Sequence, residues 1–339
     1  MASTLMAGFS RRFRSAAPAA ILLYAVCCVP ATRAQAGSEL QAPSIRANVE
    51  VVSVDVTVTD AQGRFAESLR KDDFHVFDDG LEQPVSYFAS NDAPAQVLLL
   101  VEIGPAVYIL RDEHLQAAYA LLQGLAPDDR VAVASYMDKA ASVLGFTTDK
   151  RMVSAALDSL RFNLGMGDLN LADALESAIA WRGLGKRSIV LLSTGVDTSA
   201  PEHWARSIEQ LHVSGVTVYA VALGGILREP SSEKKRKNAP NAAPPVSFEE
   251  ADRALKAIAD ASGGRAFFPR NAQEFQAAYR QIATLVRHQY SLGFAPTARD
   301  GRVHRLEVRV ELSAAQPAFT KTASTFRVDC RRAYIAPAQ

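Results

Sequence analysis

The most constraining stretch of the sequence is residues 96–106, which read QVLLLVEIGPA. Five apolar residues, 97–101, are followed abruptly by an acid, a glycine and a proline. The run is too short to span a membrane and is typical of a strand buried on both faces of a parallel sheet. Patterns typical of helices and strands alternate after it, so we predict the central strand of a doubly wound, mostly parallel α/β sheet. Ligands bind such sheets at the carboxyl ends of the strands, which makes residues 102–106 the first candidate site.

The amino terminus, residues 1–34, predicts a secretory signal peptide. Arg11, Arg12 and Arg14 precede an apolar stretch, and small residues suited to cleavage follow it. The apolar stretch is short for a membrane helix, although an uncleaved anchor is the alternative. Its removal takes away four arginines and no acid, so the formal net charge changes from +1 to −3. We expect an exported protein, periplasmic or secreted, with no stable membrane span after cleavage and no basic field for nucleic acid.

Cysteine usage limits the chemistry of the mature chain. Cys27 and Cys28 lie within the signal peptide, which leaves Cys330 alone. One cysteine forms neither an internal disulfide nor a cysteine-based metal site.

Both ends of the mature chain predict β structure. Residues 45–90 contain alternating valine and polar residues and a hairpin turn, but form a module too short to bury its own core. The period of two returns in residues 290–330. There we predict that strands 290–294 and 304–311 pair with each other across a turn, with a third strand at 322–328. We expect this segment to pack with residues 45–90 into a small β-sandwich.

Residues 95–289 predict the α/β domain inserted between these ends. Residues 140–146 should form an antiparallel edge hairpin with the strand at 130–137, and Thr148 should cap the helix that follows. Residues 227–245 predict a surface loop. Further helices are predicted at 111–124, 171–181, 201–213, 247–261 and 272–288, and further strands at 188–193, 216–223 and 265–268.

Five segments together resemble the von Willebrand factor A-like domain, and more closely the secreted VWFA-related proteins of Acidobacteria. The resemblance covers nearly the whole mature chain and implies a Rossmann-like sheet. The segments are VVSVDVTVTD at 51–60, LRKDDFHVFDDG at 69–80, PVSYF at 84–88, LSTGVDT at 192–198 and YSLGF at 290–294.

A-like domains build a metal-ion-dependent adhesion site from an Asp-x-Ser-x-Ser motif, a threonine and a second aspartate. Magnesium needs such hard oxygen ligands in near-octahedral geometry. Most side chains at the corresponding positions of this chain offer no oxygen, so the resemblance implies a degenerate site with no cofactor and no tightly bound metal. The positions hold Glu102, Gly104, Ala106, Leu169 (Asp168 with a shift of one) and Thr194.

One alternative is a rearranged oxygen site on the same rim, built from Glu102, Asp168, Asn170, Thr194 and Asp197. The competing interpretation is that these are solvated turn formers and that Glu102 accepts hydrogen bonds from loop amides. In either case the candidate binding surface comprises the loops near 102–108, 165–171 and 194–200.

No sequence motif predicts catalysis. The chain lacks a nucleophile elbow, a phosphate-binding glycine loop and a zinc-protease helix, and its six histidines are scattered. We therefore expect a non-catalytic protein that binds another protein or a cell-envelope component, with an oligomeric state that the sequence does not determine. The alternatives are metal-dependent adhesion through the rearranged site and an extracytoplasmic hydrolase with dispersed catalytic residues. A buried acid beside a histidine in a deep pocket would favour the hydrolase.

Overall fold

A computed structural model describes residues 51–91, 94–108, 111–165, 167–181, 186–223, 248–312 and 326–338. The predicted signal peptide and the predicted loop at 227–245 lie outside these ranges. All elements below belong to the unit Asn48–Gln339. Among the described helices, none combines the length and the apolar character needed to cross a membrane.

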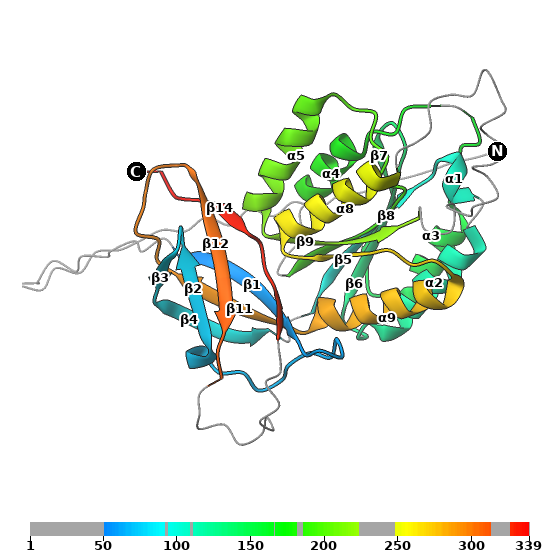
Figure 1. Ribbon diagram of the computed structural model, residues 1–339. Coiled ribbons are helices and arrows are strands. Elements are labelled where there is room, and N and C mark those ends of the chain that lie inside the picture. The colour runs from blue at the N-terminus through cyan, green and yellow to red at the C-terminus, as the bar shows by residue number, and fades with distance from the viewer. Residues whose placement is uncertain are drawn as a thin grey trace, which may run out of the picture. The chain divides into compact units, whose positions relative to one another are not determined.

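The central sheet has six strands in the order β10-β9-β8-β5-β6-β7 (Figure 1). Neighbouring strands pair in parallel except at the edge, where β7 runs antiparallel to β6 as the sequence predicted. β5 lies between β6 and β8 and is buried at every residue, as expected for the 96–106 stretch. The strands are β5 (Gln96–Glu102), β6 (Arg130–Tyr136), β7 (Ala140–Thr147), β8 (Arg187–Ser193), β9 (Val216–Ala222) and β10 (Arg265–Phe267).

Helices cover both faces of this sheet because successive side chains of a strand point to opposite sides. Leu99 of β5 belongs to an apolar cluster with α2, α3 and α9, whereas Leu98 belongs to a second cluster with α4, α5 and α8. Figure 1 shows the two helical layers on either side of the strands. The helices are α1 (Pro105–Tyr108), α2 (Arg111–Gly124), α3 (Lys150–Asp158), α4 (Leu171–Ala180), α5 (Pro201–Ser214), α8 (Phe248–Ser262) and α9 (Ala272–Arg287).

The cap of α3 differs from the prediction. Asp149, not Thr148, is the N-cap residue, and its carboxylate accepts a hydrogen bond from the backbone N of Arg151 at 2.9 Å. The hydroxyl of Thr147 accepts from the backbone N of Asp149 at 3.1 Å, so the turn before the helix places the carboxylate at the capping position.

Two further sheets have four strands each, in the orders β13-β1-β11-β4 and β14-β12-β2-β3. Each of these sheets contains strands from both chain ends, since β1 pairs with β11 and β2 pairs with β12. Val54 and Leu292 of one sheet share an apolar cluster with Val76 and Val308 of the other. The elements are β1 (Val52–Thr59), η1 (Lys71–Asp73), β2 (Phe74–Asp78), β3 (Leu81–Gln83), β4 (Val85–Asn91), β11 (Gln289–Phe294), β12 (Val303–Val310), β13 (Arg327–Asp329) and β14 (Ala333–Ile335).

The predicted pairing of strand 290–294 with strand 304–311 is wrong. β11 pairs with β1 and β4, and β12 pairs with β2 and β14, so the two strands lie in different sheets. The connection from 295 to 302 is long enough to carry the chain from one sheet to the other. β11 is also buried at every residue, as suits a strand with neighbours on both edges.

A glycine is required where α8 turns into β10. α8 ends at Ser262, one residue beyond the predicted end at 261, and Gly263 adopts a positive φ of 76°. A Cβ added at Gly264 would lie 1.9 Å from the carbonyl oxygen of Val218 in β9. The turn therefore packs directly against the backbone of the central sheet.

Gly264→Ala should lower the free energy of unfolding by about 2 kcal/mol or more, because the backbone of β9 must move to admit the methyl group. Gly145→Ala is the matched control, since a Cβ at Gly145 in β7 has nothing within 4 Å. Urea unfolding of both variants measures the difference, and equal stabilities would contradict the close approach.

Candidate functional site

The buried carboxylate of Glu102 lies at the carboxyl end of the central strand. Its side chain has no solvent exposure. Oε2 accepts hydrogen bonds from the backbone N of Thr194 at 2.8 Å, from the Thr194 hydroxyl at 2.9 Å and from the Ser193 hydroxyl at 3.1 Å. The side chain thus reaches from β5 to the end of β8, and the expected hydrogen bond from a loop amide is present.

Tyr136, the last residue of β6, extends this network to a third strand. Its hydroxyl lies 2.7 Å from the Ser193 hydroxyl and 3.3 Å from Glu102 Oε2. The Ser193 oxygen in turn accepts from the backbone N of Gly195 at 2.8 Å. Three neighbouring strand ends are therefore joined through one carboxylate.

Burial raises the pKa of Glu102 above its ordinary value, and the hydrogen bonds from Thr194, Ser193 and Tyr136 oppose that shift. Burial, together with the nearby Glu102 charge, also raises the pKa of Tyr136 well above its ordinary value. Within the described ranges no ion pair involves Glu102. The carboxylate is stabilised by neutral donors in place of a cation.

Gly104 and Leu169 lie on the Oε1 side of the Glu102 carboxylate. Gly104 is buried, and a Cβ there would lie 3.4 Å from Glu102 Oε1 and 3.4 Å from Leu169 Cδ2. An apolar side chain thus lies near the carboxylate, at the sequence position where the resemblance implies a threonine. The side chain of Ala106 lies outside the described part of the chain.

Of the remaining candidate residues, Asp197 and Asn170 form hydrogen bonds with neighbouring loop residues. Asp197 Oδ1 accepts from the backbone N of Leu171, the first residue of α4, at 3.1 Å, and Oδ2 accepts from the Ser199 hydroxyl at 2.6 Å. Asn170 donates to Asp138 Oδ1 at 2.7 Å. Asp168 is exposed to solvent. The structure therefore brings Glu102 and Thr194 together but directs the Asp197 carboxylate to a helix terminus.

A groove beside this rim contains residues that the sequence did not indicate. It is open to solvent and runs between the 195–201 loop and two helices. Trp204 of α5 and Glu250 of α8 were missed because only the spatial proximity of α5 and α8 places them beside the loop. The lining residues are Gly195, Val196, Asp197, Ser199, Pro201, Trp204, Glu250, Ala251 and Ala254.

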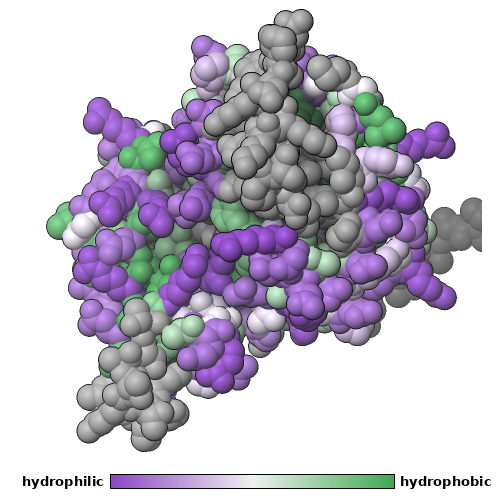
Figure 2. Space-filling model, turned by 45° about the vertical axis from the view of Figure 1, so that its right-hand side comes forward, coloured by the Kyte–Doolittle hydropathy of each residue, from purple (hydrophilic) through white to green (hydrophobic). Residues whose placement is uncertain are grey.

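An exposed apolar patch, which we call the rim patch, comprises Tyr108, Phe162 and Leu164. Tyr108 is 50% exposed and Leu164 63% exposed. The rings of Tyr108 and Phe162 lie 6.0 Å apart, and the backbone N of Asn163 donates to the carbonyl of Ile103 at 2.8 Å, which ties the patch to the end of β5. In Figure 2, exposed apolar residues form small separate groups among hydrophilic ones.

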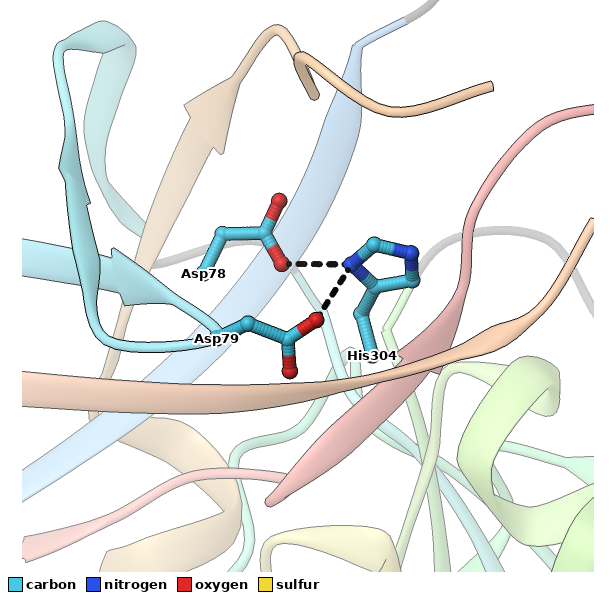
Figure 3. Close-up of side chains that lie close together, drawn as sticks. All are labelled: Asp78, Asp79 and His304. Carbon is cyan, nitrogen blue, oxygen red and sulfur yellow. Dashed lines mark hydrogen bonds and ion pairs between the residues drawn. The ribbon is translucent and has the colours of Figure 1, made fainter. Parts of the chain in front are cut away.

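A second group of acids surrounds a histidine in the four-stranded sheets. Asp78 is 5% exposed and Asp79 lies beside it, and both face His304 (Figure 3). Among the described residues, the imidazole hydrogen-bonds only to carboxylates and to no hydroxyl or thiol nucleophile. A buried acid beside a histidine is therefore present, but without a nucleophile bonded to it.

No family model and no curated protein matches this chain. Solved structures to which it is similar include an aerotolerance-related membrane protein from Bacteroides fragilis (15% identity, 57% of this chain, 98% of that chain, TM-score 0.45). A von Willebrand factor type A structure from Catenulispora acidiphila has 11% identity over 86% of this chain and 75% of that one, with TM-score 0.44. The vWF domain of the type V pili tip protein Mfa5 from Porphyromonas gingivalis has 10% identity over 57% and 95%, with TM-score 0.42. Similarities this distant carry no functional argument.

Glu102→Ala should lower the free energy of unfolding by about 3 kcal/mol, because it leaves a cavity and leaves the hydrogen-bond donors of Thr194 and Ser193 without an acceptor. Glu102→Gln is the matched variant and should cost less, since its amide oxygen still accepts from the same donors. Denaturant unfolding compares the two. A loss below about 0.5 kcal/mol for Glu102→Ala would show that the network does not stabilise the fold.

Stability should also depend on pH through Glu102. Its pKa is raised in the folded state, so the folded protein binds the proton more tightly than the unfolded chain. Its contribution to stability is greatest below the ordinary glutamate pKa of about 4.3 and falls as pH rises to the raised folded value. The difference in unfolding free energy between wild type and Glu102→Gln, followed across pH, should show this fall; the opposite slope would refute the raised pKa.

Proposed function

We propose that the protein is an exported, non-catalytic interaction protein with a von Willebrand factor A-like fold. It would bind another protein or a cell-envelope component through the carboxyl rim of the central sheet. The observation that carries this proposal is the burial and internal hydrogen bonding of the Glu102 carboxylate. The carboxylate at the position of the first adhesion-site aspartate is buried, and internal donors occupy it.

A closed carboxylate supports recognition without a metal bridge. Magnesium would need oxygens with free lone pairs and access to water. Glu102 accepts from Thr194 and Ser193, and Leu169 occupies the sequence position at which the resemblance implies a threonine ligand. A rearranged site would further require Asp197 to leave the terminus of α4, where it accepts a backbone hydrogen bond.

The rim patch and the neighbouring groove supply the recognition surface. Tyr108 and Leu164 expose apolar area at the rim, and aromatic side chains commonly dominate the energetics of protein interfaces. Asp197 and Glu250 add acids to the groove lining. A partner with an apolar anchor and basic groups at its margin would match these features.

The finer organisation is part of the same proposal. A signal peptide at 1–34 precedes the mature protein, residues 95–289 form the doubly wound A-like domain, and residues 45–90 and 290–330 form a β-sandwich. The presence of strands from both chain ends in each of two sheets, with a shared apolar cluster, supports the sandwich. The alternative of a hydrolase would rest on the Asp78–His304 pair, to which no nucleophile of the described residues is hydrogen-bonded through the imidazole.

Capture of partners from an envelope extract should decrease at least tenfold for the double variant Tyr108→Ser, Leu164→Ser, because the apolar contact area at the rim is lost. The matched control is Tyr87→Ser with Val303→Ser, which removes a similarly exposed tyrosine (55%) and aliphatic residue (52%) from the four-stranded sheets. Pull-down with quantitative mass spectrometry measures the enrichment of each protein.

The same pull-down tests the role of metal. Chelator should leave capture unchanged, and calorimetry should show no micromolar binding of Mg²⁺ to the chelator-treated protein. Capture that chelator abolishes and excess Mg²⁺ restores would establish the metal-dependent alternative. Equal capture by the rim variant and the control variant would refute the proposed surface.

A further inference from the structure

Two adjacent aspartates and a histidine distant in the sequence converge at one corner of the β14-β12-β2-β3 sheet. Asp78 ends β2, Asp79 begins the hairpin turn to β3, and His304 lies near the start of β12. Figure 3 shows the two carboxylates and the imidazole pointing toward one another. His304 Nδ1 lies 3.1 Å from Asp78 Oδ1 and 2.9 Å from Asp79 Oδ2. These ligand atoms all lie within 4.8 Å of one another, which no other trio of His, Cys, Asp or Glu achieves within the described ranges.

Each of the three residues is held from behind by a different partner. The Tyr334 hydroxyl donates to Asp78 Oδ2 at 2.9 Å, and the backbone N of Arg305 donates to Asp79 Oδ1 at 2.8 Å. His304 Nε2 lies 3.2 Å from Asp300 Oδ1. The outer atoms are therefore satisfied, and the inner atoms face a common point. Outer partners of this kind, including a carboxylate on the far nitrogen of a histidine, orient the ligands of metal sites.

The charge arrangement requires a positive species at that point. Nε2 faces the Asp300 carboxylate and so carries a proton. In a neutral imidazole, Nδ1 would then direct a lone pair at two carboxylate oxygens, which is repulsive. Either a second proton or a metal cation must lie between Nδ1 and the two oxygens. With a second proton on the ring, Asp78 and Asp79 would both pair with the one imidazolium charge of His304. The charge of Arg302 acts on Asp300 instead.

The dimensions and chemistry of the site fit a small divalent transition metal. Zinc binds histidine nitrogen and carboxylate oxygen at about 2.0–2.2 Å, so neighbouring ligands of a tetrahedral site lie about 3.3 Å apart. The separations of 2.9 and 3.1 Å need to widen by only a few tenths of an ångström. The Asp79 side chain is 55% exposed, which leaves a path for the ion and a place for water as the fourth ligand. Magnesium and calcium, which prefer oxygen ligands only, fit less well.

We propose that Asp78, Asp79 and His304 bind Zn²⁺, which takes the place of the proton on Nδ1. The ion ties the β2–β3 turn to β12 and so stabilises the sheet. This site is separate from the carboxyl rim and does not depend on the proposed interaction function.

Calorimetry with ZnCl₂ on the chelator-treated chain, prepared without a polyhistidine tag, tests the proposal. We expect one Zn²⁺ per chain with micromolar or tighter affinity. The midpoint of thermal unfolding should rise by about 5 °C when free Zn²⁺ exceeds Kd a hundredfold. Mg²⁺ at the same concentration should have no such effect.

Asp79→Asn is the informative variant, because its amide oxygen keeps the hydrogen bond from Arg305 while one anionic ligand is lost. It should weaken Zn²⁺ binding at least tenfold and abolish the thermal shift, with the unbound fold intact by circular dichroism. Glu82→Gln is the matched control: Glu82 pairs with His75 at 2.7 Å on the same sheet, but as a single carboxylate. It should bind Zn²⁺ like the wild type.

Two results would overturn the proposal: no Zn²⁺ binding by the wild type, or equal binding by Asp79→Asn and wild type. The double variant Tyr108→Ser, Leu164→Ser should bind Zn²⁺ normally. Loss of partner capture at the rim and loss of Zn²⁺ at this corner are therefore distinguishable.

Discussion

The buried carboxylate of Glu102 links the strand ends at the carboxyl rim of the central sheet. A carboxylate removed from water is costly unless hydrogen bonds or an opposite charge compensate. Glu102 is compensated by Thr194, Ser193 and Tyr136, and no cation pairs with it within the described ranges. The extra methylene of glutamate relative to aspartate lets the carboxylate reach the end of β8. Hydrogen bonds therefore join the ends of β5, β6 and β8 at the centre of this rim.

The elements that depend on local sequence were predictable. A run such as 97–101 is apolar at every position because both faces of its strand are buried, and that pattern is visible without knowledge of the partners. Pairing is not a local property. YSLGF fits either a hairpin with β12 or a strand between β1 and β4, and only the assembled sheets decide between them.

The candidate site was predictable to the same degree. Glu102 and Thr194 meet because the ends of neighbouring parallel strands must meet. The orientation of Asp197 follows from its hydrogen bond to the first turn of α4, which no spacing in the sequence reveals. The Asp78–His304 contact joins residues 226 positions apart. In the sequence Asp78 and Asp79 indicated only a turn, and His304 looked like one of several scattered histidines.

The two carboxylate groups of this chain solve the same electrostatic problem in opposite ways. At the rim, neutral hydroxyl and amide donors surround Glu102 on the inner side, so a cation would have to displace hydrogen bonds that already satisfy it. At the corner of the small sheet, the donors lie behind Asp78 and Asp79, and the oxygens that remain face an imidazole nitrogen and solvent. A cation there would displace only a proton. The physical conditions for metal binding are thus better met in the sheet built from both chain ends than at the carboxyl rim of the central sheet.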